Sequence, residues 1–545
     1  MFPTRPPDPV LAQSFRDGGY WIDRPVGYFL ERAASAIPDA VAVVDGDRRF
    51  SFADIDADAT RLASAMRGRG IGPDSVVSLQ LPNCAEAVVV FQAIMKLGAI
   101  ANPIVPIYRG REVRFIVGQA NSSMVFVRGT YRGFDYEAMY DALDIPDLDV
   151  IVVGGASWAD LLAEARPDGL DGLEEPDPDS VCLLLYTSGT TADPKGALHS
   201  HNTLVFENRS MIDWFGLNER DVIFNPSPVT HVTGVNCALT LPFLLGAPVV
   251  LQDVWDPATA LERIVRERAS FMIFSTPFLR GLLDAADASE QATPSIRYII
   301  CGGADIPDSL TAAATERLGT VVRMFGATEG PSVTSADRWD TFEMRTRTDG
   351  RPMAPTEVIV SDGGTGVAAP GVVGEALWRG PDTFLGYLDA TLNEAAFTPD
   401  GFFRTGDLAT TDEHGGLHIV GRIKDIINRS GEKISTHDVE NLLSEHPSVV
   451  EVAVVAGPDP KTGERGCAFV VTRDSGDLSL TDVYDFLTGR DVATQKIPES
   501  VFVVDSLPKT ASGKIQKFAL RDWTRNKSVV PQQMAEMTIS ASHEK

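Results

Sequence analysis

Short apolar runs alternate with amphipathic stretches along most of the chain. The runs are rich in β-branched residues and lie at 76–81, 150–153, 247–251, 271–274 and 298–300. Such runs are typical of buried strands. Apolar residues recur at helical spacing next to them, as in 85–97 and 258–268. Strands that alternate with helices predict an α/β fold with largely buried sheets.

The pattern changes after residue 358. Glycine-rich turns such as Asp362-Gly363-Gly364-Thr365-Gly366 separate short strands up to residue 418, which predicts a β-rich subdomain. Beyond it, helices are expected at 436–445 and 482–487, and strands at 450–455 and 468–471. We therefore expect a large N-terminal domain (1–421) of α/β subdomains plus the β-rich subdomain, followed by a small α+β C-terminal domain (422–545).

Composition and charge narrow the class of protein. The chain has 545 residues, of which 44% are hydrophobic, and a formal net charge of −27. This acidity argues against nucleic-acid binding and against docking on an anionic membrane. The N-terminus lacks the apolar core of a signal peptide, and no apolar stretch is long enough to insert stably in a bilayer. We expect a soluble, cytoplasmic protein.

The cysteines give no sign of a disulfide framework or a zinc site. All five are widely separated, and no C-x-x-C pair occurs. Most lie among apolar neighbours, which predicts buried thiols. They are Cys84, Cys182, Cys237, Cys301 and Cys467.

The first segment with clear chemistry follows the apolar run 183–186. It begins Thr187-Ser188-Gly189-Thr190-Thr191 and ends Pro194-Lys195-Gly196. Backbone N–H groups and hydroxyls in such a loop can converge on an anion, and Lys195 offers a cation for terminal phosphates. The spacing is not that of a Walker A loop, because Pro194 precedes the lysine. The alternative is an ordinary polar turn after a strand.

This segment resembles the signature Y-T-S-G-T-T-G-x-P-K-G of the acyl-adenylate-forming superfamily. That superfamily includes acyl-CoA synthetases, luciferases and the adenylation domains of peptide synthetases. Ala192 stands where the family usually has glycine, which implies a stiffer loop and slower phosphate handling. The resemblance extends from about Tyr28 to Arg521.

Other nucleotide-binding motifs of the family follow in order. Segment 301–304 resembles the adenine-contacting loop, 324–330 resembles Y-G-x-T-E, and 403–407 resembles Y-R-T-G-D. The resemblance implies that Glu329 and Thr190 hold Mg²⁺ and that Asp407 accepts hydrogen bonds from the ribose. The cofactor-binding residues that it implies are Thr187, Ser188, Gly189, Thr191, Gly302, Gly303, Ala304, Gly326, Ala327, Thr328, Asp407, Ile419, Arg422 and Gly431.

The C-terminal motifs carry the implied catalytic lysine and a hinge. Segment 508–514 resembles P-K-T-x-S-G-K, in which Lys514 would bridge the acid and the α-phosphate. Lys424 stands at the pivot of the family's hinge. The resemblance implies that the small C-terminal domain is mobile and exchanges Lys514 for a thiol tunnel lined near Gly431. The catalytic residues that it implies are Lys514, Glu329, Thr190, Lys195 and His231.

The family's acid pocket corresponds to Val232, Thr233, Asn236, Thr276, Gly330 and Ser332, with His231 as its gate. Enzymes of the family that activate amino acids place an aspartate next to this gate, whereas this chain has Val232. The mainly apolar lining predicts a bulky acid that is alicyclic, aromatic or medium-chain. Segment 101–109 looks like that of cyclohexanecarboxylate and related medium-chain acid ligases. His231 has the alternative of a satisfied core histidine.

The sequence thus predicts an AMP-forming carboxylic acid–CoA ligase that uses ATP, Mg²⁺ and coenzyme A. One alternative is a stand-alone adenylating enzyme that passes the acyl group to the phosphopantetheine of a carrier protein or to a partner enzyme. Another is a catalytically silent protein that binds a nucleotide or an acyl ligand. The expected partners are a small carboxylic acid and the thiol, and a homodimer is one option.

Overall fold

The computed structural model describes residues 2–187, 194–289, 293, 295–303, 306–363, 366–429, 432–473, 478–490, 492–510 and 515–526. The chain divides into two compact units. The first comprises Met1–Gly303, Leu310–Val358 and Trp378–Phe403, and the second comprises Ala304–Ser309, Ile359–Leu377 and Arg404–Lys545. The expected domain boundary between 421 and 422 falls inside the second unit and stays a prediction.

The larger sheet of the first unit has nine described strands. Their order is β17 (Arg351–Pro352), β16 (Gly330–Ser335), β15 (Thr320–Ala327), β14 (Tyr298–Gly302), β13 (Phe271–Phe274), β11 (Ile223–Asn225), β12 (Val249–Leu251), β1 (Val41–Asp45) and β2 (Arg48–Ser51). The strands from β15 to β1 pair in parallel, and antiparallel strands close both edges. Parallel strands are buried on both faces, which explains the continuous apolar runs that predicted β12, β13 and β14.

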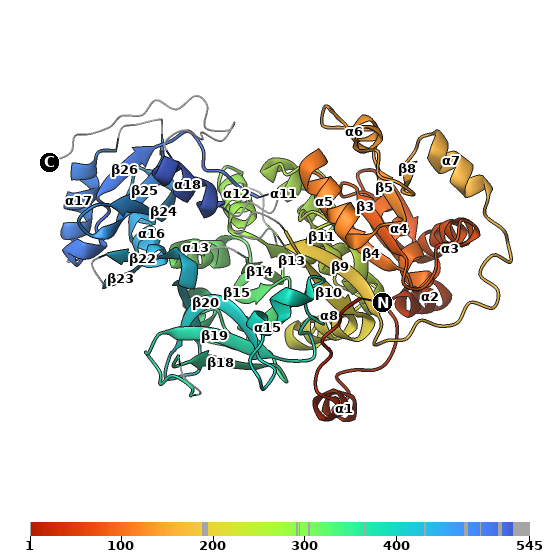
Figure 1. The fold of residues 1–545 in the computed structure, drawn as a ribbon, viewed down its shortest axis with the longest axis horizontal. Coiled ribbons are helices and arrows are strands. Elements are labelled where there is room, and N and C mark those ends of the chain that lie inside the picture. The colour runs from red at the N-terminus through yellow and green to blue at the C-terminus, as the bar shows by residue number, and fades with distance from the viewer. Residues whose placement is uncertain are drawn as a thin grey trace. The chain divides into compact units, whose positions relative to one another are not determined.

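The second sheet of this unit runs in the order β10 (Lys195–Ser200), β9 (Val181–Thr187), β4 (Ile100–Pro103), β3 (Val76–Gln80), β5 (Met124–Val127) and β8 (Asp149–Val152). Side chains alternate between its faces. Val77 and Leu79 pack with α3 (Phe52–Gly68) and α4 (Ala85–Lys96), whereas Val76 packs with α5 (Gly110–Ala120) and α6 (Tyr136–Leu143). The ribbons of these four helices lie around β3, β4 and β5 in Figure 1. The predicted α/β layering is confirmed.

A four-stranded sheet follows, in the order β18 (Glu357–Ser361), β19 (Gly374–Arg379), β20 (Phe403–Thr411) and β21 (Leu417–Arg422). Glycines with positive φ, among them Gly363, Gly371 and Gly415, lie in the turns between these strands. A left-handed backbone is readily adopted only by glycine, which explains why glycine-rich turns separate the short strands in the sequence. The predicted β-rich segment is confirmed.

The last sheet runs β23 (Glu432–Ser435), β22 (Ile426–Arg429), β25 (Gly463–Thr472) and β24 (Val449–Asp459), with β26 (Ser500–Val503) beside β25. Its two faces carry different helices. Val454 and Ala468 pack with α16 (Thr436–Ser444) and α17 (Leu480–Thr488), whereas Val455 and Phe469 pack with α18 (Lys517–Asn526). The helices and strands expected after residue 422 are therefore confirmed.

The other helices within the described ranges are α1 (Pro9–Asp17), α2 (Gly27–Ala36), α7 (Ala156–Ala163), α8 (His201–Phe215), α9 (Val232–Gly234), α10 (Leu241–Leu245), α11 (Pro257–Arg266), α12 (Thr276–Asp287), α13 (Asp308–Arg317), α14 (Phe342–Arg347) and α15 (Asn393–Ala396). A π-helix, Val235–Thr240, joins α9 to α10. The hairpin strands β6 (Thr130–Tyr131) and β7 (Phe134–Asp135) pair with each other.

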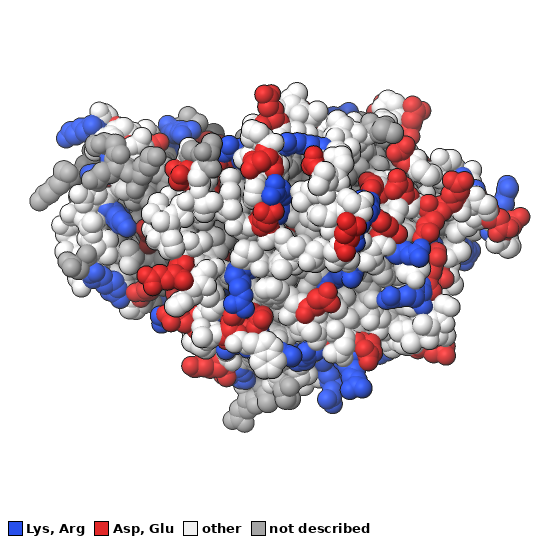
Figure 2. All heavy atoms as spheres, turned by 90° about the horizontal axis from the view of Figure 1, so that it is seen from below, with Lys and Arg blue, Asp and Glu red and all other residues white. Residues whose placement is uncertain are grey.

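Three surface and core properties follow from the described residues. No helix among them is long and apolar enough to cross a bilayer. All five cysteines are free and buried, whereas the sequence predicted burial for most of them. On the face drawn in Figure 2, acidic and basic side chains are intermixed, and no continuous basic band covers it.

Candidate active site

The lysine of the phosphate-loop motif lies at the start of an antiparallel hairpin. Lys195 is the first residue of β10 and stands opposite Thr187, the last residue of β9. A hairpin of this kind brings both ends of the connecting loop together. The loop residues themselves, namely Ser188, Gly189, Thr190, Thr191 and Ala192, lie outside the described residues.

The predicted metal ligand Glu329 lies at the tip of a second hairpin. Ala327 of β15 pairs with Gly330 of β16, so that Thr328 and Glu329 form the turn. A Cβ at Gly330 would lie 2.8 Å from the indole nitrogen of Trp378. A Cβ at Gly326 would lie 2.0 Å from the carbonyl oxygen of Pro331. The motif therefore needs small residues on both sides of the glutamate.

Hydrogen bonds fix this turn on its main chain and on its side chain. His199 of β10 donates from Nε2 to the carbonyl of Thr328 at 2.7 Å, and the amide of Phe384 donates to the carbonyl of Glu329 at 2.9 Å. The Tyr387 hydroxyl donates to the Glu329 carboxylate at 2.6 Å. Burial lowers the pKa of His199 to about 4, so its imidazole is neutral near pH 7.

Tyr387 was not singled out by the sequence. Its ring centroid lies 5.2 Å from the Lys195 ammonium nitrogen, so it contacts both the predicted phosphate lysine and the predicted metal ligand. Burial first, and then the charge of Glu329, raises the pKa of the Tyr387 hydroxyl. The hydroxyl therefore stays a donor near neutral pH. No local pattern reveals this residue, because its partners lie far away along the chain.

The surroundings of Glu329 fit a magnesium ion held mainly by substrate. The described residues contain no group of three or more His, Cys, Asp or Glu side chains that could hold a metal alone. Mg²⁺ is often bound by one or two carboxylates together with substrate phosphates and water. Tyr387 donates to Oε1 of Glu329, and within the described ranges no other side chain hydrogen bonds to this carboxylate. Oε2 can then face a metal.

The predicted adenine loop begins at the carboxyl end of β14. Gly302 stands opposite Met324 of β15, and a Cβ at Gly302 would lie 2.8 Å from the Met324 carbonyl oxygen. Gly303 has a φ of +79°. Ligands of open α/β sheets bind at the carboxyl ends of the strands, which is where these two glycines turn the chain. Ala304 lies outside the described residues.

Two predicted acid-pocket residues share a partner that the sequence did not reveal. The Ser332 hydroxyl and the Asn236 amide, the latter at 3.3 Å, both donate to Oε1 of Glu207 on α8. Glu207 is 1% exposed. Burial first, and then the charge of Asp382, raises the pKa of Glu207. In the sequence this glutamate stands beside Asn208 and Arg209 and resembles a solvent-facing position.

The other predicted pocket residues lie on neighbouring elements. Val232 is buried on α9, and the amide of Thr233 donates to Nδ1 of His231 at 3.3 Å, which caps this short helix. Thr276 is the first residue of α12, and Gly330 begins β16. The His231 imidazole is thus oriented by the main chain that follows it.

The ribose-motif residues lie in the second unit. Asp407 of β20 pairs in register with Arg422 of β21, and the guanidinium Nε lies 2.7 Å from the Asp407 carboxylate. Asp407 is 5% exposed, and its amide donates to Thr405 Oγ1 at 2.8 Å. Ile419 stands opposite Ala409 in the same strand pair. Asp407, which the resemblance assigns to the ribose, and Arg422, which it assigns to the nucleotide, therefore contact each other.

The predicted hinge residue lies directly after this pair. Lys424 is in a 3₁₀ turn, Ile423–Asp425, whose Asp425 forms an ion pair with Arg521 of α18. Burial, and next the charge of Arg422, lowers the pKa of Lys424 to about 8. Gly431 and the predicted catalytic Lys514 lie outside the described residues.

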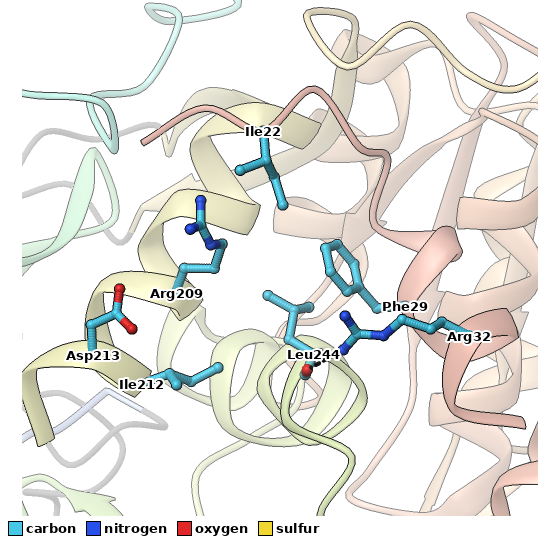
Figure 3. Close-up of a pocket in the computed structure, with 7 residues that line it drawn as sticks. All are labelled: Ile22, Phe29, Arg32, Arg209, Ile212, Asp213 and Leu244. Atoms are coloured by element: carbon cyan, nitrogen blue, oxygen red, sulfur yellow. Dashed lines mark hydrogen bonds between the residues drawn. The ribbon is translucent and has the colours of Figure 1, made fainter. Parts of the chain in front are cut away.

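A cavity of about 190 Å³ lies elsewhere in the first unit (Figure 3). It is lined by Ile22, Phe29, Arg32, Arg209, Ile212, Asp213 and Leu244. None of these is a predicted site residue. Arg32 donates to the Leu244 carbonyl at 2.8 Å, and Arg209 donates to the carbonyls of Gly19 and Tyr20, so both arginines tie chain segments together.

Comparisons with known proteins agree with this arrangement. A model of the family described as AMP-binding enzyme matches residues 30–388, and one described as AMP-binding enzyme C-terminal domain matches 438–514. The medium-chain fatty-acid–CoA ligase of Escherichia coli is 32% identical over 521 residues, covering 93% of this chain and 92% of that protein. The salicyl-AMP ligase/salicyl-S-ArCP synthetase of Mycobacterium tuberculosis is 35% identical over 532 residues, covering 93% and 92%.

A solved structure supports the same grouping. The O-succinylbenzoate coenzyme A synthetase of Bacillus subtilis, in complex with ATP and magnesium ion, superimposes with a TM-score of 0.80. It is 26% identical and covers 92% of this chain and 99% of that chain. The resemblance stated from the motifs is confirmed.

Proposed function

The chain belongs to the AMP-binding enzyme family and is an AMP-forming acid–thiol ligase, and we propose that it joins a bulky, mostly apolar acid to coenzyme A. The observation that carries the site assignment is the contact of Tyr387 with both Lys195 and Glu329. It brings together a cation and an anion that come from two separate nucleotide motifs. A structural turn needs neither charge.

The first half-reaction activates the acid. A carboxylate oxygen attacks the α-phosphorus of ATP, the bond from this phosphorus to the bridging oxygen breaks, and pyrophosphate leaves. Negative charge gathers on the phosphate oxygens, and fixed cations lower the barrier. We assign this task to Lys195 and Lys514. Glu329 and Thr190 would hold the magnesium ion, which supplies further positive charge to the same oxygens.

The second half-reaction transfers the acyl group. A thiolate attacks the acyl carbon of the mixed anhydride, the C–O bond breaks, and AMP leaves with one oxygen of the original acid. Coenzyme A is the proposed thiol, because the named E. coli relative is a CoA ligase. A carrier-protein thiol is the second candidate, because the M. tuberculosis relative is named as an S-ArCP synthetase.

The polar side chains of the predicted pocket support an apolar acid. The donors of Ser332 and Asn236 already bond to Glu207, so these groups do not require a polar partner on the substrate. Val232 offers no charge to an α-ammonium group. The two named relatives act on a medium-chain fatty acid and on salicylate, both of which join a carboxylate to an apolar body.

Pyrophosphate release with a panel of acids tests this proposal. We expect release with octanoate, cyclohexanecarboxylate, benzoate or salicylate, none with phenylalanine, and a thioester when coenzyme A is added. Release without any thioester from coenzyme A would favour a carrier protein as acceptor. No release with any acid would favour a silent binding protein and contradict the proposal.

A further inference from the structure

We propose that Tyr387 is a positioning residue for the magnesium site, which orients the Glu329 carboxylate through its hydroxyl and Lys195 through its ring. This inference rests on the proposed function, because it assumes that Glu329 meets the metal of a bound ATP. It adds a residue that no nucleotide motif of the chain contains. Four features of the structure support it.

The main chain of Tyr387 is fixed before any ligand binds. Its amide donates to Oδ1 of Asn393 at 2.7 Å, and Nδ2 of Asn393 donates back to its carbonyl at 3.2 Å. The residues before and after Tyr387 bond to β10. The amide of Leu198 donates to the carbonyl of Gly386 at 3.1 Å, and the amide of Leu388 donates to the carbonyl of Gly196 at 2.8 Å. Tyr387 is thereby laid against β10, the strand that begins with Lys195.

The glycine before Tyr387 permits this placement. Gly386 has a φ of +96°, which favours glycine, and a Cβ there would lie 2.9 Å from Oδ1 of Asn393. The asparagine can therefore approach closely enough to hold both backbone groups of the tyrosine. The tyrosine ring also packs edge-on against Phe384, with centroids 4.9 Å apart.

The hydroxyl binds one oxygen of Glu329 and leaves the other available to a metal. Tyr387 is 4% exposed, and its O–H donates to Oε1 at 2.6 Å. This hydrogen bond restrains the orientation of the carboxylate, and within the described residues no other side chain hydrogen bonds to Oε2, which is therefore available to a metal. Partners that orient a metal ligand in this way commonly change metal affinity by about 10- to 100-fold when removed.

The ring acts on the lysine independently of the hydroxyl. The Lys195 ammonium lies 5.2 Å from the ring centroid, within the range of a cation–π interaction. Tyr387→Phe removes the hydroxyl and keeps the ring, whereas Tyr387→Leu removes both. The two substitutions therefore separate the effect on Glu329 from the effect on Lys195.

The test measures ATP binding by calorimetry, with magnesium and with EDTA, and requires no acid. The magnesium ratio is the ATP affinity measured with magnesium divided by the ATP affinity measured in EDTA. We expect Tyr387→Phe to lower this ratio by about 10-fold and to leave the ATP affinity in EDTA unchanged. Tyr387→Leu should also weaken binding in EDTA, by about threefold. Tyr131→Phe is the matched control, because Tyr131 donates to Asp253 at 2.8 Å outside the site; its ratio should equal that of the wild type.

Each other outcome has a definite meaning. An unchanged magnesium ratio in Tyr387→Phe overturns the inference and leaves the proposed function intact. An equal fall in Tyr131→Phe also overturns it, because the effect would then not belong to the site. A wild-type protein that binds ATP without any gain from magnesium overturns both the inference and the proposed metal role. Failure of the wild type to bind ATP contradicts the proposed function itself.

Discussion

Glu207 is a buried carboxyl beside the predicted acid pocket, and its protonation affects the stability of the fold. It accepts hydrogen bonds from Ser332 and Asn236, and Asp382 is close enough for its charge to raise the pKa of Glu207. Asp382 is also buried, and burial raises its own pKa. Two neighbouring buried carboxyls do not readily ionise together. The folded protein therefore retains a proton that the unfolded chain releases.

The free energy of unfolding should fall as the pH rises from 5 to 8, and Glu207→Gln should make this fall smaller. The wild-type pKa is raised on folding, so this proton stabilises the fold fully below the ordinary glutamate pKa and progressively less as the pH rises toward the folded value. Glutamine keeps the shape and an acceptor for Ser332 but does not titrate. Urea unfolding at several pH values measures the difference. Parallel curves for the two proteins would show that Glu207 does not hold this proton.

At the scale of elements, the hairpin that carries Glu329 depends on close packing. Gly330→Ala would place a methyl group 2.8 Å from the Trp378 indole, so the turn or the indole must move. We expect a destabilisation of about 1–3 kcal/mol and a loss of acid-dependent pyrophosphate release that additional magnesium partly restores.

Gly118→Ala is the matched control for this substitution. Gly118 lies within α5, and no heavy atom would meet its added Cβ within 4 Å. Alanine in a helix should stabilise the protein by about 0.5–1 kcal/mol and leave activity unchanged. If Gly330→Ala behaves like Gly118→Ala in unfolding and in activity, the tight turn is not needed to place Glu329.

Buried elements were the easiest to predict from the sequence. The run 271–274 coincides with β13, and the helix expected at 85–97 is α4, Ala85–Lys96. A strand buried on both faces must be apolar throughout, so its local pattern is sufficient. The segment 385–388 was missed because its pairing with 196–198 of β10 joins residues far apart in sequence. Such pairings leave no local period.

The same reason explains which site residues were found. Lys195 and Glu329 belong to compact motifs whose order along the chain is itself informative. Tyr387 and Glu207 contact residues that are distant in sequence, and an isolated tyrosine or glutamate in a sequence is too common to indicate a site. A buried glutamate is indistinguishable from an exposed one until the partners of its helix are known.

For the whole molecule, the proposed reaction requires different residues for its two half-reactions. We predict that Lys514→Ala reduces adenylation by at least about 100-fold while thioester formation from supplied acyl-adenylate continues, because a cation at the α-phosphate is needed only in the first step. Single-turnover assays of each step provide the measurement. An equal loss in both steps would contradict the expectation that the C-terminal domain takes one arrangement for adenylation and another for thioester formation. Lys424→Pro, at the predicted hinge, should mainly lower the rate of thioester formation.

Transfer of oxygen from the acid to AMP tests carboxylate adenylation most directly. The chosen acid is labelled with ¹⁸O in its carboxylate and converted in the presence of ATP and coenzyme A, and the nucleotide is analysed by mass spectrometry. We expect AMP to gain one labelled oxygen, because the acid attacks the α-phosphorus and AMP later leaves with that oxygen. Label in inorganic phosphate, with ADP as the product, would contradict this expectation.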